Sequence, residues 1–246
     1  MERPVVPADL EAIITRITAP QVASSEPVAA GELARLDRWW RSVSDGGAPR
    51  VATLRSAGTM LEAGIADADR AIDGGHTLLV PRVTHRDPVG ALTVIALLTR
   101  SEAQAITSQP AGMSDRAWVE RCAAVRDSII EFADLRAAPA ELLFALNATE
   151  IAFVVGALLA SAARRTPSII EGTDELAAAL VADRLSFRAK DWWRASSTSS
   201  DPARKAAVDR LDLTAGLPLE LTDEDGRGAE ATVALLNLVS DAADAT

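Results

Sequence analysis

The stretch Pro167–Leu185, "PSIIEGTDELAAALVADRL", decides the fold class because it joins a strand pattern directly to a helix pattern. Its first part is a short apolar run bounded by Pro167 and Gly172, which is typical of a buried strand in a parallel sheet. The part from Thr173 onward predicts a helix. A strand followed at once by a helix is the repeating unit of α/β proteins.

The same alternation is repeated elsewhere in the chain. "HTLLVP" (76–81) predicts a buried strand, and "RDPVGALTVIALLT" (86–99) predicts a helix with Asp87 as N-cap and Pro88 at its first position. "DWWRASS" and "LPLEL" predict further short strands, and "AQAITS" is a weaker strand candidate. Short apolar strands that alternate with helices predict a mostly parallel sheet covered on both faces.

Helical periodicity dominates the rest of the sequence. Helices are predicted over "PADLEAIITRI", "GELARLDRWWRSV" and "GTMLEAGIADADRAIDGG". Others are a long helix capped by Ser114 and one that starts at Asp201-Pro202. The segment from Ser44 to Gly58 is rich in Gly, Pro and Ser and predicts a connection.

These patterns predict a single domain over residues 1–246. We expect an N-terminal helical part (1–57), then an α/β core with the C-terminal helix (58–246). The fold class is α/β: a reduced parallel sheet with helices on both faces, plus a small helical lobe from the N- and C-terminal segments. With 246 residues, 48% of them hydrophobic, the chain is long enough for a substantial core.

Composition excludes several classes of partner. The formal net charge of −10 argues against nucleic acid or an anionic membrane, because both would be repelled. The apolar run Ile151–Ala163 is shorter than the roughly 20 residues that span a bilayer, so it predicts a buried core helix. Since the first residues show no apolar signal region, we expect a cytoplasmic protein.

The chain is also poor in metal ligands and nucleophiles. Its only histidines are His76 and His85, which makes an ordinary zinc site improbable, so no metal and no cofactor are expected. The single cysteine, Cys122, excludes an internal disulfide, and within its amphipathic helix it is expected to be a small buried hydrophobe. The tryptophan pairs at 39–40 and 192–193 are expected to be core or interface anchors rather than base-stacking platforms.

The C-terminal stretch "LDLTAGLPLELTDEDGRGAEATVALLNLV" carries the first part of a family resemblance. It resembles the end of the nicotinate-nucleotide:dimethylbenzimidazole phosphoribosyltransferases, where a leucine-rich strand precedes the loop R-L-G-E-G-T-G-A and an apolar helix. Asp225 stands at the glutamate of that loop, and Gly226 and Gly228 stand at its glycines. Arg227 replaces the threonine of the family.

Upstream segments match the same family in the same order. "SSTSSDPAR" is similar to H-x-S-x-E-P-G-H, with Ser199 and Asp201 at the serine and the acid, although both histidines are replaced. "NATEIAFVVGALLASAARRTPSIIEG" is similar to the G-G-x-E-I helix and the P-V-x-x-D-G strand, with Glu171 at the aspartate. The resemblance covers the chain from about residue 30 to 240.

Two parts of the family pattern are missing. Nothing matches the D-H-G segment, and "PRVTHRDPVG" stands where a phosphate-binding glycine loop is expected. Glycines let backbone N–H groups approach a phosphate closely, which this sequence does not allow. Gly112, in "AGMSD", keeps part of a second glycine loop.

The resemblance implies transfer of phosphoribose from nicotinate mononucleotide to a benzimidazole-like base. It makes Asp225 the general base and Gly112, Glu171, Ser199, Asp201, Gly226, Arg227 and Gly228 substrate-binding candidates. Arg227 either pairs with Asp225 or contacts a phosphate. Small-molecule substrates and a homodimer, or a heterodimer with a full-length relative, are the implied partners.

Simpler interpretations of these residues remain open on sequence alone. Asp225 is equally a helix-start carboxylate, and the Asp-Pro pair at 201–202 favours an N-cap. Glu171 is either a ligand contact or a solvated acid, and Arg82, His85 and Arg86 form either a phosphate site or a solvated turn. The missing motifs support an alternative function, that of a non-catalytic homologue acting as a regulatory or structural subunit.

Overall fold

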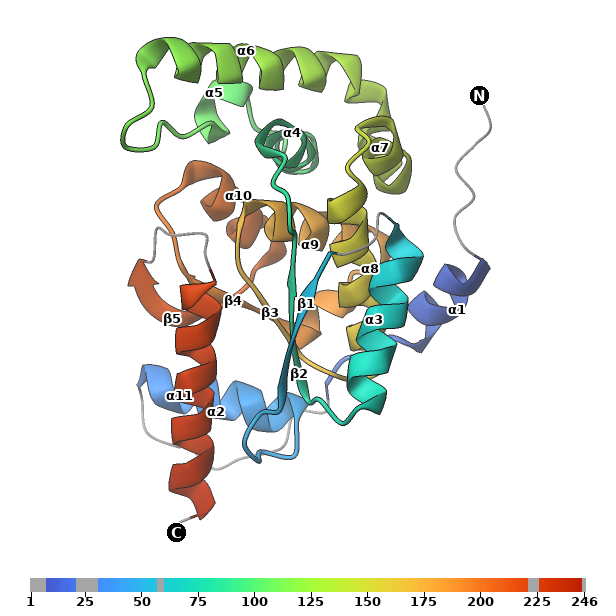
Figure 1. The fold of residues 1–246 in the computed structure, drawn as a ribbon, viewed down its shortest axis with the longest axis vertical. Coiled ribbons are helices and arrows are strands. Elements are labelled where there is room, and N and C mark those ends of the chain that lie inside the picture. Colours follow the sequence, from blue (N-terminus) through green and yellow to red (C-terminus); the bar gives the residue numbers. More distant parts are fainter. Residues whose placement is uncertain (1–7, 21–30, 57–59, 221–225, 245–246) are drawn as a thin grey trace.

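A parallel sheet forms the centre of the computed structural model (Figure 1), which describes residues 8–20, 31–56, 60–220 and 226–244. Within those residues the sheet has five strands in the order β1-β2-β3-β4-β5, and every neighbouring pair is parallel. The parallel sheet predicted from the sequence is therefore confirmed. The strands are β1 (Val51–Arg55), β2 (Leu78–Arg82), β3 (Ser168–Ile170), β4 (Trp193–Thr198) and β5 (Ala215–Glu220).

Helices cover both faces of this sheet, as predicted. Because neighbouring strands follow one another in sequence, right-handed crossovers place the connecting helices on one face. These helices pack side by side and are α3 (Leu61–Asp73), α8 (Thr149–Ala163), α9 (Thr173–Leu185) and α10 (Pro202–Leu211). The other face carries α2 (Glu32–Val43) and α11 (Arg227–Asp244), which contact each other and β5.

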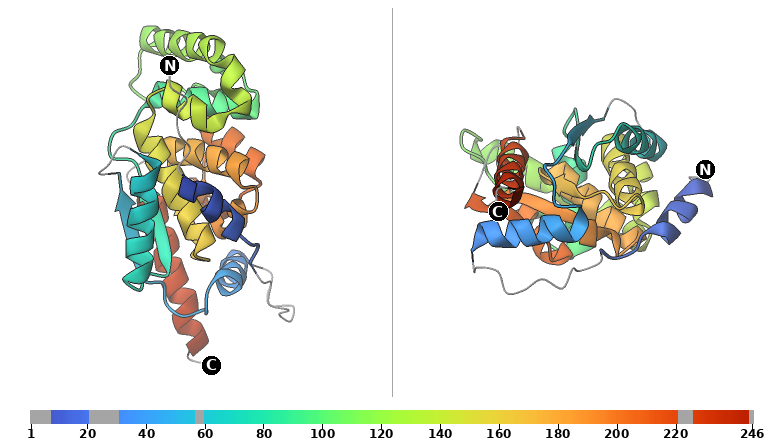
Figure 2. Two further views of the ribbon diagram at one scale, coloured as in Figure 1. Left: turned by 90° about the vertical axis from the view of Figure 1, so that its right-hand side faces the viewer. Right: turned by 90° about the horizontal axis from the view of Figure 1, so that it is seen from below.

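A further group of helices lies between β2 and β3 in the chain. Figures 1 and 2 show this group at one end of the molecule, beyond α9 and α10, whereas α2 and α11 lie toward the other end. It comprises α4 (Pro88–Thr99), α5 (Ala103–Ile106), α6 (Asp115–Glu131), the 3-10 turn η1 (Ala133–Ala137) and α7 (Pro139–Ala145). Two smaller elements, α1 (Ala8–Arg16) and the 3-10 turn η2 (Ala189–Trp192), pack on α8.

Three helix starts have the predicted caps. The Asp87 carboxylate accepts a hydrogen bond from Gly90 N at 3.0 Å, and Ser114 Oγ accepts one from Ala117 N at 3.3 Å. The Asp201 carboxylate caps α10. Each bond satisfies an N–H group that the first helical turn leaves without a partner.

Two element predictions were wrong. The segment Ser44–Gly58 was expected to be a connection, yet it contains β1. β1 lies at the sheet edge and pairs only with β2 in the described residues, so it needs no continuous apolar run. "AQAITS" was expected to be a strand but forms α5, in which Ala103 and Ile106 share one buried side at helical spacing.

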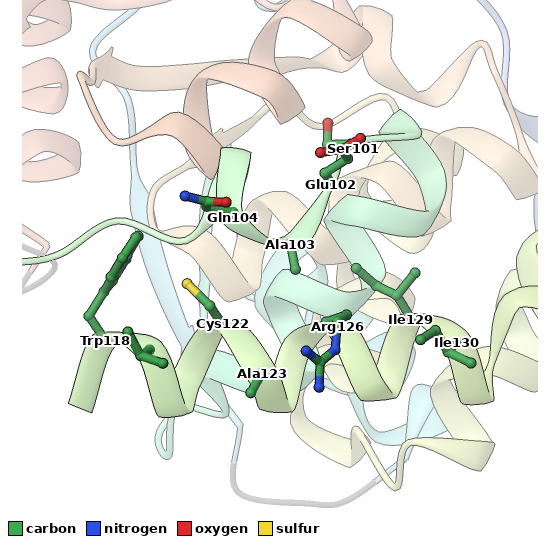
Figure 3. A pocket seen from close by; sticks show the side chains of 11 residues that line it. Ser101, Glu102, Ala103, Gln104, Trp118, Cys122, Ala123, Arg126, Ile129 and Ile130 are labelled. Carbon is green, nitrogen blue, oxygen red and sulfur yellow. The ribbon is translucent and has the colours of Figure 1, made fainter. Parts of the chain in front are cut away.

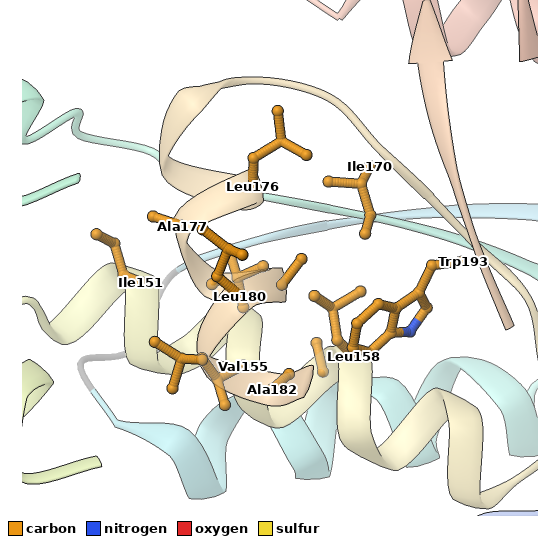
Figure 4. Close-up of a cluster of buried hydrophobic side chains, with 14 of the residues drawn as sticks. Ile151, Val155, Leu158, Ile170, Leu176, Ala177, Leu180, Ala182 and Trp193 are labelled. Atoms are coloured by element: carbon orange, nitrogen blue, oxygen red, sulfur yellow. The ribbon is translucent and has the colours of Figure 1, made fainter. Parts of the chain in front are cut away.

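The hydrophobic core lies between the sheet and its crossover helices. Figure 4 shows Ile151, Val155 and Leu158 of α8 against Leu176 and Leu180 of α9, with side chains of β3 and β4 nearby. All five are buried, which confirms that the apolar run of α8 is a core helix. In the described part of the chain, no helix is long and apolar enough to cross a membrane.

Two glycines let α3 and α8 cross at very short range. A Cβ added to Gly64 would overlap the carbonyl oxygen of Phe153, and one added to Gly156 would overlap that of Leu61. The backbones of the two helices therefore touch without intervening side chains. This contact fixes α8 and its first residues relative to the sheet.

Candidate active site

Glu171 joins the end of β3 to the start of α11. Its Oε1 accepts a hydrogen bond from Gly228 N at 3.0 Å, and its Oε2 accepts one from Ala229 N at 2.8 Å. The side chain is buried, and Arg82 Nη1 lies 3.4 Å from Oε2. A carboxylate at a helix N-terminus satisfies free N–H groups and is stabilised by the positive end of the helix dipole. Glu171 therefore anchors α11 to the carboxyl edge of the sheet.

The glycines that precede and begin α11 are required by this packing. Gly226 has a φ of +97°, and a Cβ there would lie 2.6 Å from Arg82 Nη1. At Gly228 a Cβ would lie 2.8 Å from Glu171 Oε1 and 3.0 Å from Ser196 Oγ. Both positions thus bring backbone against polar side chains, for which glycine alone leaves room.

Buried carboxylates of α9 hold the loop that follows β2. Glu175 Oε1 accepts a hydrogen bond from Val83 N at 3.0 Å and lies 3.8 Å from Arg82 Nε. Asp174 accepts a hydrogen bond from Asp87 N at 3.1 Å and lies 3.5 Å from Arg86 Nη1. Burial raises the pKa of Glu175 to about 7, although the Val83 N–H group and the Arg86 charge lower it.

Glu150, in the first turn of α8, binds the same loop from the other side. Its Oε2 accepts hydrogen bonds from Ser56 Oγ, Thr84 N and His85 N, each at 2.7 Å, and Oε1 lies 2.8 Å from His85 Nδ1. Burial alone would raise the pKa of Glu150, but these hydrogen bonds outweigh it and lower the pKa. Arg82, His85 and Arg86 each lie close to an internal acid, and the His85 side chain is 85% exposed on a bend, as the solvated-turn interpretation expected.

A cavity of about 130 Å³ opens beside the start of α11. Arg55 and Arg82 line it from the ends of β1 and β2, and Gly226, Ala229 and Glu230 line it from α11 and the residue before it. Asp225, the predicted general base, lies outside the described residues, directly before Gly226 in the chain. Arg227 follows as the exposed first residue of α11.

Ser199 and Asp201 lie beyond the end of β4, on the same edge of the sheet. Asp201 Oδ1 accepts hydrogen bonds from Ala203 N and Arg204 N, both at 3.0 Å, as the N-cap interpretation predicted. Ser199 Oγ accepts a hydrogen bond from Asp201 N at 3.1 Å, and Ser108 Oγ donates one to Asp201 Oδ2 at 2.6 Å. That last bond holds the loop before α6 against α10. Gly112 lies in this loop, in an exposed turn at φ +88°.

A larger cavity, of about 590 Å³, lies between α5 and α6 (Figure 3). Trp118, Cys122 and Ile129 line it from α6, and Gln104 lines it from α5. Cys122 is half-buried, close to the expectation of a small buried hydrophobe. Glu102 and Arg126 are the charged side chains of this lining, which contains no histidine among the described residues that could act as a base toward the thiol.

Comparison with known proteins identifies the family. A family model described as "Phosphoribosyltransferase" matches residues 45–245. The nicotinate-nucleotide–dimethylbenzimidazole phosphoribosyltransferase of Streptomyces avermitilis is 37% identical over 179 residues, which cover 72% of this chain and 48% of that protein. The chain belongs to the nicotinate-nucleotide:dimethylbenzimidazole phosphoribosyltransferase family.

Other members of this phosphoribosyltransferase family give the same picture. The Streptomyces coelicolor protein of the same name is 33% identical over 163 residues, covering 65% of this chain and 46% of its own length. The chain therefore spans about half the length of the curated phosphoribosyltransferases it matches. A crystal structure of the enzyme from Thermus thermophilus superimposes with a TM-score of 0.67 at 18% identity, covering 95% of this chain and 94% of that one. It shows the shared fold.

Two acids of the candidate site in this phosphoribosyltransferase family member were not predicted from the sequence. Glu150 matched the family helix motif, yet nothing local showed that it binds the loop after β2. Glu175 carried no motif at all, and its partner Val83 lies 92 residues away. The only signal for Glu175 was the segment "TDEL", which places two acids in the first turn of a helix after a predicted strand.

Proposed function

We propose that this protein transfers phosphoribose from nicotinate mononucleotide to a benzimidazole-like base. In this reaction a ring nitrogen of the base attacks the anomeric carbon of the ribose. The bond from that carbon to the nicotinate nitrogen breaks, and nicotinate leaves with the electron pair. The proton on the second nitrogen of the base passes to a carboxylate, which we assign to Asp225.

The anchoring of α11 by Glu171 is the observation that carries this proposal. The Glu171 carboxylate fixes Gly228 and Ala229 at the edge where the strands end, which is where parallel α/β sheets bind ligands. Asp225 precedes these anchored residues by only a few positions. We therefore assign Glu171 a positioning role, in place of the direct substrate contact expected from sequence.

The substrate phosphate has to be bound by groups other than the backbone N–H groups of a glycine loop. The N-terminus of α11 already holds the Glu171 carboxylate, and Arg82 and Arg86 face buried acids. Arg55, at the end of β1, lines the cavity beside Gly226, and Arg227 begins α11. We propose that these two guanidinium groups bind the phosphate, since guanidinium groups suit bidentate phosphate contacts.

A direct assay tests the reaction. The protein is incubated with nicotinate mononucleotide and dimethylbenzimidazole, and nicotinate and the new nucleotide are quantified by chromatography. Equal amounts of both products are expected. Arg55→Ala should raise KM for the mononucleotide, whereas Arg16→Ala, in α1, should not. No turnover, together with no thermal shift from either substrate, would overturn the proposal.

The same geometry also favours a second candidate, a non-catalytic subunit. The cavity of about 130 Å³ is small beside the ~300–1,000 Å³ of typical ligand sites. Arg82, one of the two arginines of its lining, already faces Glu171 and Glu175. A subunit role predicts a stable complex with a co-expressed full-length relative, measured by size-exclusion chromatography with light scattering. A homodimer that forms no complex with the co-expressed relative would contradict the subunit role.

A further inference from the structure

A second polar cavity lies at the opposite edge of the sheet, where the strands begin. Its volume is about 190 Å³. Arg194, the second residue of β4, and Thr214, just before β5, line it from the sheet. Trp39 of α2 and Lys190 of η2 also line it. Because Ser199 and Asp201 follow the other end of β4, this cavity is distinct from the candidate active site.

Arg194 is a buried cation whose Nε has no hydrogen-bonding partner among the described residues. Arg194 as a whole is 7% exposed, and its Nε is buried without a hydrogen-bond acceptor among the described residues. The guanidinium carbon lies 5.1 Å from the centre of the Trp39 ring, so the aromatic face covers one side of the charge. Burial lowers the pKa of Arg194 to about 10, opposed by the Glu32 charge. Glu32 itself forms an ion pair with Arg35 at 2.9 Å.

A buried cation is costly unless an anion lies close to it, so an anion in the cavity that Arg194 lines would stabilise the folded protein. Lys190 adds a second cation, although its Nζ donates a hydrogen bond to Leu211 O at 3.2 Å. Asp191 and Asp212 also line the cavity, and both are exposed. The Arg194 charge is thus buried and Lys190 is half-buried, whereas the two negative charges lie in solvent, where they are screened.

We propose that this cavity binds a small oxyanion through Arg194 and Lys190. The volume is below that of sites for drug-sized ligands and the lining offers two cationic side chains, so we infer a small carboxylate or phosphate as the occupant. A carboxylate or phosphate oxygen in the cavity would accept hydrogen bonds from the guanidinium group of Arg194 and the ammonium group of Lys190, the two cationic side chains of its lining. The site is independent of the transfer chemistry proposed at the other edge.

Thermal unfolding and calorimetric titration with acetate, nicotinate and inorganic phosphate test this site, at ionic strength matched with chloride. The wild type should bind at least one of the three saturably and rise in Tm. Arg194→Met should weaken that binding at least tenfold while its Tm without ligand equals or exceeds that of the wild type. Acetate and nicotinate report a carboxylate site, and phosphate reports a phosphate site.

Arg188→Met is the matched control, because Arg188 is also an arginine over an aromatic ring, 5.7 Å from the Phe187 centroid, but is exposed. It should bind as the wild type does. Equal binding by Arg194→Met and the wild type would overturn the proposal, as would the absence of saturable binding to the wild type. Arg194→Lys is a second variant, which keeps the positive charge but lacks the planar guanidinium group that makes bidentate hydrogen bonds. It should bind more weakly than the wild type.

Discussion

The Glu171 carboxylate lies 3.0 Å from the backbone nitrogen of Gly228, and this contact joins β3 to the start of α11. A second bond to Ala229 N and the nearby Arg82 guanidinium complete the arrangement. The acid that the family resemblance assigned to substrate binding thus supports the glycine segment beside the predicted base. A residue at the end of β3 therefore positions the start of α11 in the candidate site.

Removing this carboxylate should release α11 from the sheet. Glu171→Ala leaves two N–H groups and Arg82 without their acceptor in a buried setting, so the free energy of unfolding should fall by on the order of 3 kcal/mol. Urea denaturation measures it, and amide exchange at Gly228 and Ala229 should accelerate. Glu131→Ala, at an exposed helix end, is the control and should change little. Unchanged stability in Glu171→Ala would contradict the anchoring role.

Glu175 predicts a pH dependence of stability near neutrality. Its pKa is about 7 in the folded protein, against the ordinary value of 4.5. Between those values the folded state binds more protons than the unfolded state, so stability falls as pH rises from 4.5 to 7. Glu175→Gln should flatten this part of the curve, measured by urea denaturation from about pH 4.5 to about pH 8. A slope as steep as that of the wild type would show that Glu175 is not the group responsible.

Glu150 predicts the opposite dependence at lower pH. Since its pKa lies below 4.5 in the folded protein, the folded state binds fewer protons and stability falls as pH drops below 4.5. Glu150→Gln should remove that component of acid destabilisation and loosen the loop at Thr84 and His85. Urea denaturation extended from about pH 4.5 down to about pH 3 measures this component. An acid limb identical to that of the wild type would be inconsistent with the four contacts of this side chain.

The crossing of α3 and α8 should tolerate no side chain. Gly156→Ala places a methyl group on the Leu61 carbonyl, so the free energy of unfolding should drop by about 2 kcal/mol or more. Gly31→Ala is the control, because a Cβ there meets nothing within 4 Å. If both variants denature at the same urea concentration, the two backbones do not touch as described.

Local features were predictable from sequence, and long-range ones were not. The strand–helix unit at Pro167–Leu185 and the caps Asp87 and Asp201 depend on neighbouring residues, so their patterns are visible in a short window. β1 was missed because an edge strand is defined by its partner rather than by its own apolar residues. The role of Glu171 was missed because it depends on contacts with residues 57 and 58 positions away.

Nicotinate release from nicotinate mononucleotide in the presence of dimethylbenzimidazole tests whether a carboxylate before α11 acts as the base of a phosphoribosyl transfer. The wild type should release nicotinate, and Asp225→Asn should reduce kcat by on the order of a hundredfold or more. Asp223→Asn, a matched change two positions earlier in the chain, should retain most activity. Equal rates for Asp225→Asn and the wild type, or no release by the wild type, would contradict the claim.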